Sequence, residues 1–173
     1  AGLHGVGLSC VNALSDRLKV EIRRKGNLHV QEFRRGEPSH ALKTLAEAAG
    51  HGTRIEFRPD RTIFKDFKDF DAAACRRLLE DLSFLVPGTE FVLRSAGEKR
   101  EIFRTESGLA GFLARLTHNA RKLFPEPIAV RLANRGLHFQ AALQWTTDRE
   151  PKIRSFVNCV NTAHGGAHVR ALR

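Results

Sequence analysis

Residues 2–15 read Gly2-Leu3-His4-Gly5-Val6-Gly7-Leu8-Ser9-Cys10-Val11-Asn12-Ala13-Leu14-Ser15, a glycine-rich loop that runs into an apolar segment. The loop has three glycines within six residues, which removes side chains where another group can approach the backbone closely. The apolar segment predicts a helix over 9–14, whose free amide groups and dipole favour an anion at the loop. A tight turn is the commoner interpretation of such a loop, so phosphate binding and a plain turn both stay open.

The glycine spacing matches neither of the two best-known phosphate-binding motifs. A Walker A loop would end in Gly-Lys-Ser or Gly-Lys-Thr, and this loop has no lysine. A dinucleotide fingerprint would follow a strand, and its glycines would come in a different order. Any phosphate bound here would therefore depend on backbone amides.

After the loop and the predicted helix, the apolar residues alternate as they do in the strands of a sheet. Alternating apolar residues predict strands over 18–24 and 28–33, joined by a turn at Lys25-Gly26-Asn27 into a hairpin. A third strand is predicted over 53–57, ended by Pro59. The irregular stretch 36–51 is expected to be a surface loop.

The rest of the chain alternates helix and strand signals. Asp71 is a candidate N-cap for a helix over 72–85, which Pro87-Gly88 would end. This helix is expected to cover the antiparallel sheet, and two further strands are expected over 91–94 and 102–104. A second helix should begin near Ser107, followed by strands at 128–132, 137–145 and 153–160 and by a loop over 161–168. The fold class is therefore α+β, with a domain boundary near Arg104.

Composition and charge limit the kinds of protein and of partner that fit the sequence. The chain has 173 residues with a net charge of +10, which favours phosphate-rich partners such as nucleic acid, although a general bias towards arginine gives the same balance. Cys10, Cys75 and Cys159 are far apart and favour free thiols in a reducing cytoplasm. No apolar run reaches the roughly 20 residues that span a bilayer, so no membrane association is expected. The absence of methionine and the opening inside a loop suggest a piece of a longer protein.

Several stretches together resemble one family. The string Gly2–Ser15 resembles the triphosphate-binding loop and helix of the ATP-hydrolysing subunits of bacterial type IIA DNA topoisomerases, namely the B subunit of gyrase and the E subunit of topoisomerase IV. The landmarks that follow in the same order are 52–60, 77–88, Ala142-Leu143-Gln144-Trp145, Ser155-Phe156-Val157-Asn158, Asn161-Thr162 and Gly165-Gly166-Ala167-His168. The resemblance covers essentially the whole chain and favours gyrase over topoisomerase IV.

The resemblance implies a fold and a site. Residues 1–104 would be the later half of a Bergerat-type ATPase sandwich, as in Hsp90, MutL and sensor histidine kinases. Residues 105–173 would begin a ribosomal-S5-like transducer domain. The residues implied to bind ATP are Gly2, Leu3, His4, Gly5, Val6, Gly7 and Thr53, and Arg24 would lie at the mouth of the pocket that aminocoumarin inhibitors reach. No catalytic residue and no metal ligand is assigned within the chain.

The same resemblance implies cofactors and partners. ATP and Mg²⁺ would be the cofactors, with the catalytic glutamate, the magnesium-holding asparagine, the adenine-binding aspartate and the phosphate-reaching lysine on segments outside this chain. DNA, the A subunit of gyrase or its topoisomerase IV counterpart, and a second copy closed by ATP would be the partners. A non-enzymatic basic nucleic-acid-binding protein and a MutL-type ATPase remain alternatives, the second disfavoured by Ala142-Leu143-Gln144-Trp145.

A few residues depart from the family or carry a competing interpretation. Ala167 stands where the family usually has threonine, which removes a possible helix cap. Thr53 could be an ordinary β-branched strand residue, and Arg24 an ordinary solvated charge at a strand end. His4 is expected to contribute its backbone, because no partner that would orient a general base is identifiable.

Overall fold

The computed structural model describes residues 5–172, apart from the side chain of Ala46. The chain divides into two compact units, Ala1–Asp69 and Phe70–Arg173. We call them the sheet unit and the helix-pair unit after their main elements. No helix in the described part of the chain is long and apolar enough to cross a bilayer.

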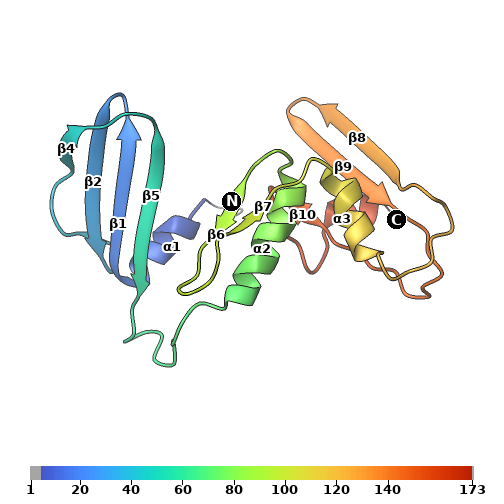
Figure 1. Ribbon diagram of the computed structural model, residues 1–173, viewed down its shortest axis with the longest axis horizontal. Helices are drawn as coiled ribbons and strands as arrows, with labels where there is room; N and C mark the ends of the chain where they lie inside the picture. The colour runs from blue at the N-terminus through green and yellow to red at the C-terminus, as the bar shows by residue number, and fades with distance from the viewer. Residues whose placement is uncertain (1–4, 173) are drawn as a thin grey trace. The chain divides into compact units, whose positions relative to one another are not determined.

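The sheet unit is a short helix followed by an antiparallel sheet of five strands (Figure 1). The strands run in the order β3-β2-β1-β5, and β4 also pairs with β2. The elements are α1 (Gly7–Ala13), β1 (Ser15–Arg24), β2 (Asn27–Arg34), β3 (Glu37–Pro38), β4 (Lys43–Glu47) and β5 (Gly52–Pro59).

The predicted hairpin is present, and its turn explains its register. Lys25 and Gly26 both have positive φ, 50° and 78°, which gives a two-residue turn whose twist matches the flanking strands. Arg24 then lies opposite Asn27, and Leu18 opposite Phe33. Leu18 and Val30, on opposite faces of the sheet, are the most buried apolar side chains described in this unit, at 2% and 5% exposed.

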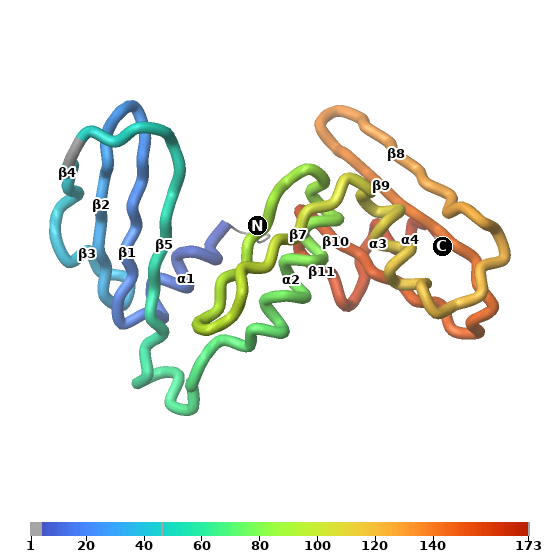
Figure 2. Tube along the Cα trace, viewed as in Figure 1, coloured from blue at the N-terminus to red at the C-terminus, as the bar shows by residue number. Residues whose placement is uncertain are grey.

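The prediction of a structureless loop over 36–51 is wrong. β3 and β4 both pair with β2 in this stretch, along the left-hand edge of the sheet in Figure 2. Leu42 and Leu45 stay exposed, so the segment carries no burial pattern that would mark it as a strand. Pairing with the free edge of β2 stabilises this segment instead, since the unpaired amides and carbonyls of an edge strand can hydrogen-bond to any extended backbone.

In its described residues the helix-pair unit contains three helices, of which the first two pack on each other, and several two-stranded ladders. Its elements are α2 (Ala72–Leu85), β6 (Phe91–Leu93), β7 (Glu101–Phe103), α3 (Gly108–Leu116), β8 (Ile128–Asn134), β9 (Leu137–Leu143), β10 (Phe156–Val157), β11 (Val160–Asn161) and α4 (Ala167–Leu172). The ladders are β6–β7, β8–β9 and β10–β11, all antiparallel.

The Asp71 cap of α2 is confirmed. One Asp71 carboxylate oxygen accepts hydrogen bonds from the amides of Ala73 and Ala74, at 2.8 and 3.0 Å. The helix ends at Leu85, directly before Val86 and Pro87, as predicted. It packs on α3 and on the β6–β7 ladder, and Phe84 lies 5.6 Å from Phe112, ring centre to ring centre.

One further expectation fails in this unit. The segment 153–160 does not form one strand, because the chain reverses at Asn158 and Cys159, both with positive φ, into the β10–β11 hairpin. The helix 72–85 belongs to the helix-pair unit, and its covering of the sheet stays a prediction; within the sheet unit, α1 packs on the sheet.

Candidate functional site

The glycine-rich loop is described from Gly5 onward, and Gly2, Leu3 and His4 lie outside the described residues. Gly5 has a φ of +67°, which a residue with a side chain rarely adopts. A methyl group added at Gly5 or at Gly7 would meet no atom within 4 Å. The backbone of this loop is therefore bare and open to a ligand.

Helix α1 begins two residues earlier than predicted, so Gly7, the last glycine of the loop, is also the first residue of the helix. The N-cap residue Val6 makes no side-chain capping bond, and the first turn carries no acidic side chain. The first amides of a helix have no acceptor within the helix. Since no side chain of the described residues caps them, these amides can donate to an incoming anion.

The C-terminal end of α1 is better secured than its N-terminal end. Ser15 is buried, and its hydroxyl donates to the carbonyl of Val11 at 2.6 Å. The carbonyl of Leu14 accepts from the amide of Asp60 at 3.0 Å. The helix is thus attached to the sheet at the point where the chain enters β1.

Thr53 lies near the start of β5, opposite Ile22 of β1. Side chains alternate along a strand, so Thr53 shares its face of the sheet with Ile55 and Phe57. These two side chains are exposed, at 41% and 39%. A hydroxyl beside exposed apolar side chains is an arrangement that suits a flat heterocycle with one polar edge.

Arg24 is the last residue of β1 and is exposed. It follows Ile22 by two positions, which places it on the same face of the sheet as Thr53. The structure therefore brings Thr53 and Arg24 to one end of one face. The sequence predicted both residues, but only the register relates them to each other.

Thr53 and the glycine loop lie on different elements of the sheet unit. The α1–β1 junction is at the end of the sheet where Ser15 pairs with Pro59, whereas Thr53 pairs with Ile22, seven positions further along β1. At about 3.3 Å per residue this separation is roughly 23 Å. Helix α1 is about 10 Å long at 1.5 Å per residue, so the loop at its start is separated from that junction by the length of the helix.

A buried carboxylate was missed by sequence reasoning. Asp60 is 2% exposed, and its carboxylate accepts from the amide and hydroxyl of Thr62 and from Nε of Arg35. Hydrogen bonds from Thr62, followed by that of Arg35, hold the pKa of Asp60 below its usual range. The only sequence signal was its place after Pro59, which is typical of a turn aspartate.

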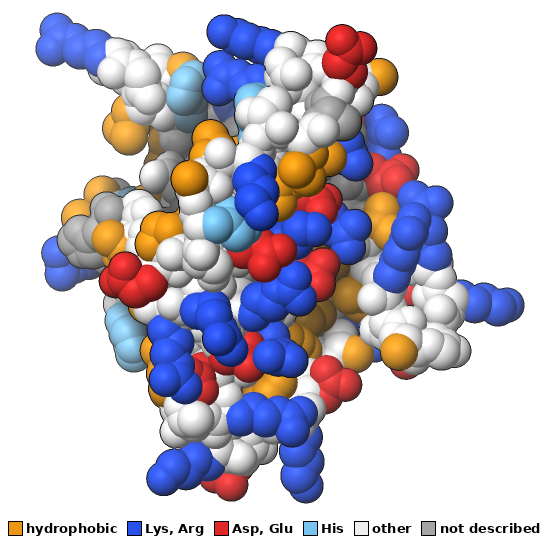
Figure 3. Space-filling view, turned by 90° about the vertical axis from the view of Figure 1, so that its left-hand side faces the viewer, with side chains coloured by type: hydrophobic (Ala, Val, Ile, Leu, Met, Phe, Trp, Pro, Cys, Tyr) orange, Lys and Arg blue, Asp and Glu red, His pale blue; other side chains and the backbone are white. Residues whose placement is uncertain are grey.

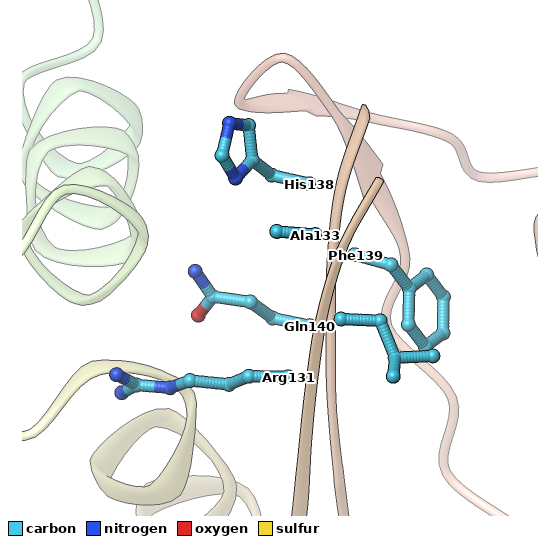
Figure 4. Close-up of a pocket in the computed structure, with 6 residues that line it drawn as sticks. Arg131, Ala133, His138, Phe139 and Gln140 are labelled. Atoms are coloured by element: carbon cyan, nitrogen blue, oxygen red, sulfur yellow. The ribbon is translucent and has the colours of Figure 1, made fainter. Parts of the chain in front are cut away.

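Two hollows in the helix-pair unit are less suited to a nucleotide. One, of about 250 Å³, lies along the β8–β9 hairpin, where Arg131, Ala133, His138 and Gln140 project to one side and Phe139 to the other (Figure 4). The other, of about 490 Å³, is lined by Arg77, Leu78, Asp81, Arg115, Leu116, His118 and Arg154. In the second hollow Arg115 and Arg154 are already paired with Glu80 and Asp81, at 2.8 and 2.9 Å.

No group of three or more metal-ligating side chains is present among residues 5–172. His168 instead lies within 3.4 Å of the hydroxyl of Thr162, which in turn contacts the hydroxyl of Ser155 at 2.6 Å. The described residues thus offer backbone amides and a hydroxyl to a nucleotide, and no metal cluster.

Comparison with known proteins gives these features a context. The family description DNA gyrase B matches residues 108–173. The chain is 37% identical to the B subunit of DNA gyrase from Archaeoglobus fulgidus over 99% of its length and 38% identical to that of Chlamydia muridarum over 97%. It spans 28% and 22% of the length of these two relatives.

Solved structures agree with these relatives. The 43K ATPase domain of Thermus thermophilus gyrase B, in complex with an aminocoumarin, matches 98% of the chain with a TM-score of 0.83 and 33% identity. The topoisomerase IV ATP binding domain of Francisella tularensis matches 99% with a TM-score of 0.81 and 28% identity. The chain covers 47% of each. Over nearly its whole length, the chain is therefore similar to DNA gyrase B subunits and to the ATPase domains of gyrase B and topoisomerase IV.

Proposed function

We propose that this chain forms part of the ATP site of a type IIA DNA topoisomerase, of the gyrase B or topoisomerase IV kind. The single observation that carries the proposal is the bare loop at Gly5–Gly7, which leads into an uncapped helix in a chain similar to these proteins. The loop amides, including those of Gly2, Leu3, His4 and Val6, would hold the phosphates. Thr53 would hydrogen-bond at the adenine side.

The residues present fit a nucleotide, with one group of residues for its phosphates and another for its base. At one end, amides and the helix dipole would stabilise the negative charge of the phosphates. At the other, the apolar face with Ile55 and Phe57 would accept the base, and the Thr53 hydroxyl would orient it. Arg24 would lie at the outer edge of this second end. Bound ATP with Mg²⁺ would supply the phosphoanhydride whose hydrolysis drives the enzyme.

The complete protein would couple ATP hydrolysis to DNA strand passage. The proposed partners are DNA, the A subunit of gyrase or its topoisomerase IV counterpart, and a second copy of the complete protein. We also propose a boundary near Arg104 between the ATPase domain and a transducer domain over 105–173. This boundary differs from the division into compact units at Asp69, because α2 packs with α3.

A basic nucleic-acid-binding protein without enzymatic activity is the rival proposal, favoured by the net charge of +10. Figure 3 argues against a dedicated nucleic-acid surface on the face that it shows. Lysine and arginine side chains are spread over that face, with acidic and hydrophobic side chains between them. Mixed signs weaken the field that a polyanion would meet.

Titration of a non-hydrolysable ATP analogue into the complete protein that carries this chain separates the two proposals. The nucleotide proposal predicts saturable binding and DNA binding that changes when the analogue is present. The rival predicts DNA binding that falls steeply with salt and ignores the analogue. Absence of analogue binding by the folded wild-type protein would refute the nucleotide proposal.

A further inference from the structure

Asp60 lies at a joint where three segments of the sheet unit meet. Its carboxylate accepts from the amide and the hydroxyl of Thr62, at 2.8 and 2.7 Å, and from Nε of Arg35 at 2.5 Å. Its own amide donates to the carbonyl of Leu14 at 3.0 Å. One residue thus joins the end of β5, the turn between β2 and β3, and the C-terminus of α1.

The turn between β2 and β3 reaches the same junction by a second route. Arg35 has a φ of +51°, and its amide donates to the carbonyl of Ser15 at 2.8 Å. A methyl group added at the neighbouring Gly36 would lie 3.5 Å from Cα of Ala13. The α1–β1 junction, Ala13–Ser15, is therefore held from both sides by backbone bonds that Asp60 and Arg35 fix in place.

This joint is the main attachment of α1. A helix of seven residues is unstable by itself in water, so its direction depends on tertiary contacts. Its N-terminal end has no side-chain cap, and space is open around Gly5 and Gly7. The position of the loop is consequently set from the other end of the helix, where Leu14 and Ser15 are bonded.

We propose that Asp60, acting with Arg35, is a positioning residue for the phosphate end of the nucleotide site. This inference rests on the proposed function. Asp60 does not touch the nucleotide; it fixes the α1–β1 junction, and the junction fixes the amides at Gly5–Gly7. Thr53 lies six positions before Pro59 in β5 and pairs with Ile22, so the adenine end is held by the ladder and is independent of the joint.

The charge at the joint is permanent at neutral pH. The hydrogen bonds from Thr62 and Arg35 keep the pKa of Asp60 below its usual range, so the carboxylate stays ionised. Asp60→Asn keeps the shape of the side chain and removes this charge. Arg35→Met removes the other partner at a site where the arginine side chain is 60% exposed, so this second variant is expected to fold.

The test compares two ligands in the complete protein. Affinities for a non-hydrolysable ATP analogue and for adenosine are measured by titration and by displacement, for the wild type, Asp60→Asn and Arg35→Met. Arg17→Met is the matched control, because Arg17 pairs with Glu32 on the same sheet at 3.2 Å and does not reach the junction. Thermal unfolding of each variant shows whether it is folded at the measuring temperature.

Both joint variants are expected to bind the analogue roughly tenfold more weakly, since small misplacements of binding groups cost at least this much. Adenosine affinity should stay within about twofold, and the Arg17→Met protein should match the wild type. An equal loss for both ligands, or no loss for either, would overturn the positioning role. Failure of the folded wild type to bind the analogue would instead reject the proposed function itself.

Discussion

The sheet unit and the helix-pair unit are held together by different kinds of interaction. In the sheet unit, long backbone ladders run between β1, β2 and β5, and Leu18 and Val30 are buried on opposite faces of the sheet. In the helix-pair unit the ladders are short or isolated, and α2 and α3 meet through side chains around Phe112. The first unit can thus present a loop and a strand end for binding, whereas the second depends on a few side chains for its packing.

Arg115 shows how the helix-pair unit uses side chains. Its guanidinium lies over the rings of Phe84 and Phe112, at 5.5 and 5.1 Å from their centres. It also pairs with Glu80 and Asp81 of α2. Asp81 in turn accepts from Arg154 at 2.9 Å. A single network of aromatic and charged groups therefore connects α2, α3 and the segment before β10.

The largest expected effect is from Phe112→Ala. Phe112 is 4% exposed and is the one buried apolar side chain of the helix-pair unit among the described residues. Truncating a buried phenylalanine costs about 3–5 kcal/mol. Hydrogen exchange followed by mass spectrometry should show lost protection in α2 and α3, with the β1–β2 ladder unchanged. An equal loss of protection from exchange in both units would mean that they unfold together.

Asp81→Asn is expected to have the next largest effect. It leaves Arg115 and Arg154 without the carboxylate that they share, in a partly exposed setting that reduces the cost to about 1–2 kcal/mol. Urea unfolding would measure the loss in free energy of unfolding, and added salt should reduce the difference between the variant and the wild type. Asp148→Asn, which breaks the exposed pair with Lys152, is the control and should cost less than about 0.5 kcal/mol. Similar values for the two variants would contradict the importance of the network.

Asp71→Ala tests the start of α2. Loss of the two capping bonds to Ala73 and Ala74 should destabilise the helix by about 1 kcal/mol. Faster amide exchange should be confined to the first turn of α2. Asp71→Ser is the matched variant and should retain most of the stability, since serine also caps helices. A serine variant as unstable as the alanine variant would show that capping is not the cause.

The smallest expected effect is a pH dependence at Glu101. Hydrogen bonds from Arg76, at 2.6 and 2.7 Å, hold the pKa of Glu101 below its usual 4.5. Its contribution to stability is therefore complete above about pH 4.5 and is lost as the pH falls through the lower folded-state pKa. Unfolding between pH 6 and pH 3 should show this loss in the wild type and a flatter profile in Glu101→Gln. Identical profiles would exclude Glu101 as a source of acid sensitivity.

The sequence predicted those elements whose residues carry the information locally. The helix 72–85 had a cap at Asp71, leucines at helical spacing and a stop at Pro87-Gly88. The β1–β2 hairpin had alternating apolar residues around Gly26. In both cases the local preference and the tertiary structure agree, which is why propensity and pattern were sufficient.

Other elements depend on contacts that are distant in sequence. β4 forms because β2 offers a free edge, and nothing within 43–47 indicates it. The reversal at Asn158–Cys159 was not predicted, since cysteine seldom takes positive φ. For the site, the glycine spacing pointed to Gly5 and Gly7 and the family resemblance to Thr53, but the joint at Asp60 required knowledge of which segments meet.

We propose that the open backbone at Gly5–Gly7 holds nucleotide phosphates. Gly7→Ala tests it most directly, because Gly7 is helical and open, and alanine there should stabilise α1 by up to about 1 kcal/mol. Titration of a non-hydrolysable ATP analogue into the complete protein should nevertheless show affinity at least about tenfold weaker, about 1.4 kcal/mol. Leu8→Ala, at an exposed position of the same helix, should bind like the wild type. Wild-type affinity in the folded Gly7→Ala protein would contradict the account.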